Sequence, residues 1–80
     1  MITSEQIRAA RGLLGWSQAY LARQAGVGLM TIKRMEANPG RVSGTVDTVL
    51  RVEAALESAG IRFIGADKDG GPGVRHSKRK

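Results

Sequence analysis

The most constraining feature of this 80-residue sequence is a pair of short apolar-periodic segments, residues 17–25 and 28–37, on either side of Gly26. Small or apolar residues recur in both segments at helical spacing, at Leu21, Ala22, Ala25, Ile32 and Met35. Glycine permits the positive φ that a sharp turn between two helices requires, and Ala22 is small enough for a second helix to cross close to it. The sequence therefore predicts two short helices joined by a tight turn.

Longer helices are predicted on either side of this pair. The first covers about residues 4–14, and either Thr3 or Ser4 can cap its start. The second begins at Thr45, stops at Gly60 and has the strongest apolar stripe in the chain. That stripe consists of Val46, Val49, Leu50, Val52 and Leu56.

A single short strand is predicted after the helices, at residues 61–64. These residues have high strand propensity and lie between two glycines. Because the sequence indicates no partner strand in the same chain, we expect the strand to pair with its copy in a second chain, or else to lie flat on the helices. The dimer contact then consists of Val52, Ile61, Arg62, Phe63 and Ile64.

The last fifth of the chain differs in composition from the rest. It is rich in glycine, and Val74 is its only large apolar residue. Residues 66–80 hold five Lys and Arg against two Asp, so they account for +3 of the net charge of +6. Such a segment buries too little apolar surface to offset its ordering entropy. We therefore predict a domain over residues 1–64 and a flexible basic tail over residues 65–80, which either attracts polyanions or only aids solubility.

Together these patterns predict an all-α fold: a compact bundle of four to five helices, followed by one short C-terminal β-strand and a flexible basic tail. The chain has no cysteine, which excludes disulfides and cysteine-based zinc sites, and its one histidine, His76, stands alone. We expect no metal, no cofactor, no small-molecule ligand and no enzymatic activity. The apolar runs are too short to span a membrane and no leader is indicated, so a cytoplasmic location is expected.

The stretch from Trp16 to Val27, WSQAYLARQAGV, followed by TIKRME at residues 31–36, resembles the Cro and phage-repressor (XRE) type of helix-turn-helix regulator. The resemblance covers about residues 4–58. It implies a helical bundle of about five helices that binds operator DNA as a dimer, with its third helix in the major groove.

The same resemblance implies roles for individual residues. Gln18 would contact a phosphate together with the backbone amides at the start of its helix, where the helix dipole favours an anion. Ser17, the expected cap of that helix, is also expected among the DNA-binding residues. Arg11 and Glu36 match a family pair that ties the first helix to the end of the third. This pairing favours a structural role for Arg11 over a contact with DNA.

The expected recognition helix is less polar than is common in that family. Members commonly have polar residues where this chain has Gly28, Leu29 and Met30. Gly28 offers no side-chain cap, and the next two residues can make only apolar contacts, best with thymine methyl groups. The residues expected at the DNA are Leu29, Met30, Thr31, Lys33 and Arg34. Alternatively, Leu29 or Met30 packs against the preceding helix or a partner protein, and Arg41 either reaches the DNA or is solvated.

The first hypothesis is a sequence-specific double-stranded DNA-binding transcriptional regulator of bacterial or phage type. It would repress its own or adjacent genes as a nucleoid-associated homodimer on a two-fold operator. The alternative is an antitoxin or anti-activator whose main role is to bind a partner protein, a toxin or an activator. A small RNA-binding protein would fit the charge but not the helix-turn-helix spacing.

Overall fold

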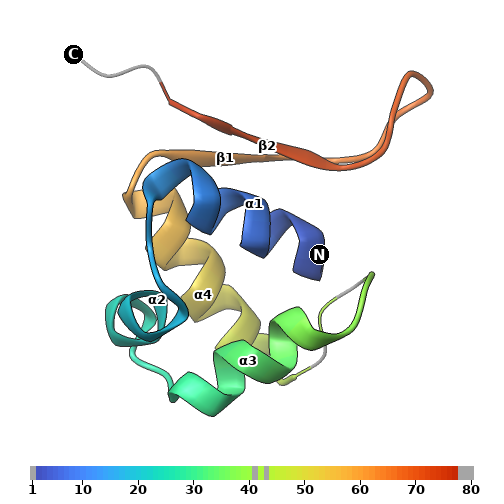
Figure 1. Cartoon of the computed structure of the whole chain (residues 1–80). Helices are drawn as coiled ribbons and strands as arrows, with labels where there is room; N and C mark the ends of the chain where they lie inside the picture. Colours follow the sequence, from blue (N-terminus) through green and yellow to red (C-terminus); the bar gives the residue numbers. More distant parts are fainter. Residues whose placement is uncertain (1, 41, 43, 78–80) are drawn as a thin grey trace.

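The computed structural model describes residues 2–40, 42 and 44–77, which form four helices and a two-stranded antiparallel sheet (Figure 1). The elements are α1 (Ser4–Leu14), α2 (Gln18–Ala25), α3 (Leu29–Ala37), α4 (Val46–Ser58), β1 (Ile61–Ile64) and β2 (Gly73–His76). The predicted helical character is confirmed, whereas a fifth helix is absent from these residues. None of the four helices is long and apolar enough to cross a membrane.

Side-chain caps explain where three of the helices begin. The Thr3 hydroxyl accepts a hydrogen bond from the Gln6 backbone N–H at 3.1 Å, and Gln6 Oε1 accepts one from the Thr3 backbone N–H at 2.9 Å, which closes a capping box. At α2 and α4 the Ser17 and Thr45 hydroxyls accept a hydrogen bond from the backbone N–H groups of Tyr20 and Thr48, without the reciprocal bond. By contrast, α3 starts after Gly28 without a side-chain cap, as predicted.

The core lies where the four helices meet beneath the sheet. Its largest fully buried side chains come from every helix: Ile7 from α1, Leu21 from α2, Ile32 from α3, and Val49, Val52 and Leu56 from α4. The short helix α2 packs against both α3 and α4. The helical spacing in the sequence therefore predicted the core faces of α1, α2 and α3 correctly. In α4 the predicted stripe holds for Val49, Val52 and Leu56 but is wrong for Val46 and Leu50, which are exposed because the hairpin and the other helices leave that side of α4 uncovered.

The C-terminal segment corrects two predictions. β1 pairs with β2 of the same chain, with Ile61 opposite His76 and Ile64 opposite Gly73, so the expectation of a strand without an internal partner is wrong. Because Gly73–His76 is a strand, the prediction of a flexible tail does not hold for those residues. The physical reason is that backbone pairing to β1 and the packing of Val74 against the core order this segment despite its glycines. Residues 78–80 of the expected tail lie outside the described residues.

The hairpin of β1 and β2 has two different faces. Ile61 is buried in the core, and Phe63 and Val74 pack against the core. The alternate residues Arg62 and Arg75 are exposed and lie directly opposite each other. Figure 1 shows the hairpin lying across α1 and α4, at the opposite end of the molecule from α3.

Candidate nucleic-acid interface

The turn between α2 and α3 has the geometry that the sequence predicts. Gly26 has a φ of 71°, in the left-handed region, and its backbone N–H points to the Ala22 and Arg23 carbonyl oxygens at the end of α2. The Val27 N–H also donates to the Ala22 carbonyl, at 3.0 Å. The small side chains of Ala22 and Ala25 are buried between the helices. These contacts fix α3 at a sharp angle to α2, as in a helix-turn-helix.

An ion pair holds α3 against α1. Arg11 Nε donates to Glu36 Oε2 and Arg11 Nη2 donates to Glu36 Oε1, both at 2.7 Å, and the Glu36 side chain is buried. This bidentate hydrogen bonding raises the pKa of Arg11 above its ordinary value. Arg11 Nη1 also donates to the Trp16 carbonyl at 3.0 Å, so it reaches the chain just before α2. The predicted structural pair is therefore present.

A second set of bonds ties the start of α1 to the turn after α3. The Ser4 hydroxyl donates to the Asn38 carbonyl at 2.6 Å, and the Ser4 backbone N–H donates to the Gly40 carbonyl at 2.8 Å. The Glu5 carboxylate accepts a hydrogen bond from the Gly40 N–H at 3.1 Å, which lowers the pKa of Glu5. The end of α3 is thus held by neighbours from α1 on two sides.

Gln18 and Ser17 lie together at the start of α2. Gln18 Nε2 donates to Glu36 Oε1 at 3.3 Å, a bond that the sequence did not predict. A side-chain amide has two N–H donors, so one remains for a phosphate. The Ser17 hydroxyl accepts from the Tyr20 N–H at 3.0 Å, and its own proton is still free to donate. Glu36 therefore links the start of α2 to Arg11.

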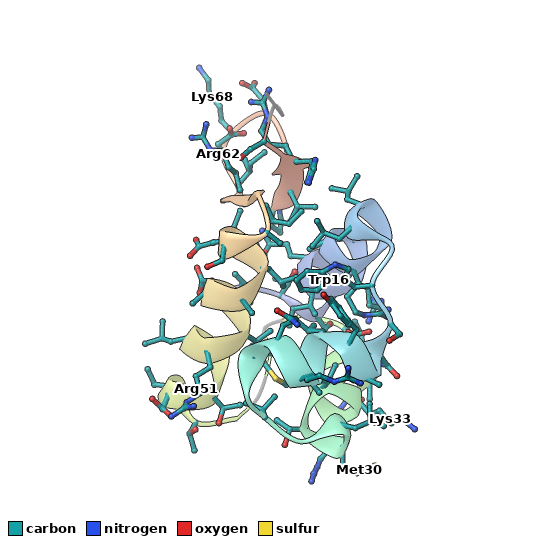
Figure 2. All side chains as sticks on the ribbon, turned by 90° about the vertical axis from the view of Figure 1, so that its left-hand side faces the viewer. Trp16, Met30, Lys33, Arg51, Arg62 and Lys68 are labelled. Carbon is teal, nitrogen blue, oxygen red and sulfur yellow. The ribbon has the colours of Figure 1, made fainter. Side chains whose placement is uncertain are left out.

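The outer face of α3 presents both apolar and basic side chains. Leu29 is 39% exposed and Met30 is 59% exposed. Lys33 and Arg34 are exposed and Thr31 is half-buried. In Figure 2, Met30 and Lys33 lie at the end of the molecule farthest from Arg62 and Lys68. Since Leu29 and Met30 are not core residues, the single chain leaves both free to contact another molecule.

The start of α4 adjoins this face, which sequence reasoning missed. Thr31, Arg34 and Met35 of α3 line a hollow with Gly44 and Thr48. Thr45 was recognisable as a cap, but its place beside α3 depends on the intervening loop, whose path no local pattern fixes. Arg41, for which the sequence left contact with DNA and solvation as alternatives, lies outside the described residues.

The predicted dimer contact divides into buried and exposed residues. Val52 is 0% exposed and Ile61 is 2% exposed, so both side chains are occupied by the core of their own chain. Phe63 is half-buried, while Arg62 and Ile64 lie on the surface. Alternation along the strand could have indicated the burial of Ile61, whereas that of Val52 follows from its place on the inner stripe of α4.

An apolar groove lies between α4, the start of α1 and the hairpin. Its volume is about 650 Å³, and it is lined by Ile2, Thr3, Gln6, Leu50, Glu53, Phe63, Ile64, Gly65, Ala66 and Pro72. Leu50 is 54% exposed and Ile64 is 41% exposed, and Val46 lies exposed one turn before Leu50 on α4. The sequence did not predict this groove because residues of the hairpin turn, Gly65, Ala66 and Pro72, form part of its wall.

A family model described as helix-turn-helix matches residues 7–58, which include most of α1 and the whole of α2, α3 and α4. The chain belongs to the Cro/C1-type (XRE) family of helix-turn-helix proteins. This XRE-family match supports a DNA-binding regulator with double-stranded DNA as its partner, in a family that is typically non-enzymatic. The hairpin lies beyond the matched residues. No curated protein matches the chain.

No metal centre is evident in the described part of this XRE-family chain, where no three His, Asp or Glu side chains come together. His76 lies half-buried in β2, opposite Ile61. His76 therefore lies in the hairpin, outside the helix-turn-helix.

Proposed function

We propose that the protein is a sequence-specific transcriptional regulator, a repressor that binds a two-fold operator as a homodimer with α3 in the major groove. The observation that carries this proposal is the outer face of α3, which leaves Leu29, Met30, Lys33 and Arg34 exposed. The other face of α3 is fixed by the Arg11–Glu36 pair and by the turn at Gly26. A rigid helix with an exposed basic face fits a groove about 12 Å wide.

Base reading by this helix would be largely apolar. The first residues of a recognition helix reach the base edges, and here they are Leu29 and Met30. Their side chains can contact thymine methyl groups, while Lys33 can donate to guanine O6 and N7. We expect an operator with T-rich steps beside a guanine contacted by Lys33.

The phosphate contacts would come from residues around α3. Ser17 and Gln18 have free donors at the start of α2, where the helix dipole favours an anion. Arg34 and Thr31 lie beside the start of α4 and suit the next phosphates along the groove. These contacts would set the orientation of the protein without reading sequence.

The apolar groove supports the homodimer. Leu50 and Ile64 are exposed at its edge, where a two-fold axis would bring each against its copy in the partner chain. The two recognition helices would then lie about 34 Å apart, one turn of DNA. Occupancy of the operator would depend on the concentration of the dimer.

The test is to select bound duplexes from a random pool, footprint the enriched sequence and measure the mass of the complex. We expect one enriched sequence with two related half-sites about one helical turn apart, bound by two chains. Failure to enrich any sequence from the pool would contradict the proposal.

The exposed pair Leu29 and Met30 also favours a second candidate function, binding to a partner protein such as a toxin or an activator. This candidate predicts a stoichiometric partner on purification and no retardation of genomic DNA fragments. Replacement of Met30 by Glu would then release the partner, whereas replacement of the exposed α1 residue Leu13 by Glu would not.

A further inference from the structure

We propose that the outer face of the hairpin is a second binding site for nucleic-acid phosphates, which engages a duplex other than the one that α3 reads. The starting observation is that Arg62 of β1 and Arg75 of β2 are paired directly across the sheet and are both exposed. Like charges in this position destabilise a strand pair. Among the described residues, no carboxylate lies within ion-pair distance of either arginine. The fold thus holds two guanidinium groups together without neutralising them.

The surroundings of the two arginines suit a phosphate. Arg62, Arg75, His76 and Ser77 line a hollow of about 320 Å³ at this end of the hairpin, and none of them is acidic. Each guanidinium can bind a phosphate through two parallel N–H donors. In the sequence, residues 61–80 contain six Lys and Arg against two Asp, and such a net positive charge attracts a polyanion.

The hairpin's orientation separates this site from α3. Ile61, Phe63 and Val74 face the core, so Arg62 and Arg75 must face away from the helices. Figures 1 and 2 both show the hairpin at one end of the molecule and α3 at the other. A duplex seated on α3 lies on the far side of the helices from the two arginines. The phosphates that they bind must therefore belong to another duplex.

The chemistry of the hollow favours nucleic acid over an acidic protein partner. The core of a protein interface is typically apolar and aromatic. The four residues that line this hollow are instead two arginines, a histidine and a serine. Interfaces with DNA are more polar and much more positively charged than those between proteins. We therefore commit to duplex phosphates as the ligand.

The first test is ¹⁵N NMR of the full chain with a short duplex of random sequence. We expect two separate sets of shifted resonances, one on α3 and one at Arg62, Arg75 and their neighbours. The hairpin set should persist in the variant K33A/R34A and vanish in R62A/R75A. If the hairpin resonances do not shift when the duplex is added, the proposal is overturned. If they shift with polyglutamate but not with the duplex, the ligand of the site is an acidic protein.

The second test measures whether the protein bridges two duplexes. One duplex is immobilised, and the protein is expected to capture a second, fluorescent duplex on it. In R62A/R75A the amount of captured duplex should fall at least tenfold, while binding of a single duplex through α3 persists. R62K/R75K should retain part of the capture because it keeps the charge. Undiminished capture by R62A/R75A would refute the second site.

Two controls separate the outcomes. R62A/R75A should melt no lower than the wild type, because the substitution removes a like-charge pair. A melting temperature several degrees lower would contradict the claim that the pair does not stabilise the hairpin. If the hairpin resonances respond to DNA while those of α3 do not, the proposed function of α3 fails and the second site stands.

Discussion

Glu36 is the residue on which the position of the recognition helix most depends, because it bonds to both Arg11 and Gln18. Replacement of Glu36 by Gln would leave the Arg11 guanidinium without its carboxylate at a largely buried position. We expect the free energy of unfolding, measured by urea denaturation, to fall by about 2–3 kcal/mol, the scale of hydrogen bonds to charged groups. The matched control is Asp47→Asn, which breaks the exposed Asp47–Arg51 pair and should cost less than about 0.5 kcal/mol. Equal losses in the two variants would contradict this role for Glu36.

Met30 tests the apolar base contact at the same scale. If its side chain touches a thymine methyl group in the selected duplex, replacement of that thymine by uracil removes the contact without other change. One buried methyl group contributes about 0.8 kcal/mol, so wild-type binding should weaken about fourfold. Met30→Ala should bind the thymine and uracil duplexes equally. A variant that still distinguishes the two duplexes would rule out Met30 as the reader.

At the scale of the elements, Gln6 joins α1 to the hairpin. Its Nε2 donates to the Ile64 carbonyl at 3.1 Å and to the Gly73 carbonyl at 2.8 Å, so one buried amide bonds to both strands. Gln6→Leu should accelerate hydrogen exchange at the β2 amides about tenfold, because it leaves two carbonyls without a donor. The amides of α2 and α3 should keep their rates, and Gln24→Leu, an exposed control on α2, should change neither. Unchanged exchange in β2 would show that Gln6 does not hold the hairpin.

The elements also show where sequence reasoning succeeds. Each helix was predictable because caps such as Ser17 and breaks such as Gly26 are local signals that agree with the apolar period. The exposure of Leu29, Met30 and Lys33 follows from the same period, since Ile32 and Met35 define the buried face.

The hairpin was missed although a local signal was present. Asp67 accepts hydrogen bonds from the backbone N–H groups of Asp69 and Gly70, which is a turn typical of hairpins. No local pattern reveals that Gln6, near the start of the chain, donates a hydrogen bond to the Gly73 carbonyl of the hairpin. The groove beside Leu50 and Ile64 could not be predicted for a similar reason, because segments far apart in the sequence form its walls.

Across the whole molecule, two of the exposed basic pairs lie at separated ends. Lys33 and Arg34 lie on α3, and Arg62 and Arg75 lie on the hairpin at the opposite end. The net charge of +6 therefore does not describe one continuous surface. A dimer with two such chains would have a DNA-reading side and a second basic side.

The homodimer itself can be tested at the apolar groove. Leu50→Glu and Ile64→Glu each place a charge on an exposed groove residue, so the fold should persist while the dimer dissociates. Sedimentation should then give the mass of one chain, with operator affinity at least tenfold lower. Leu13→Glu, an equally exposed leucine on α1 outside the groove, should remain dimeric. Groove variants that stay dimeric would place the interface elsewhere.

Whether α3 reads base sequence is measured by the ratio of the affinities for the selected and the random duplex. Lys33→Ala should lower that ratio by about tenfold, because a contact with a base edge contributes about 1–3 kcal/mol of discrimination. Lys68→Ala, an exposed lysine at the far end of the molecule, should leave the ratio unchanged. If Lys33→Ala weakens binding to both duplexes by the same factor, α3 does not read the sequence through Lys33, which contradicts the proposed role of α3.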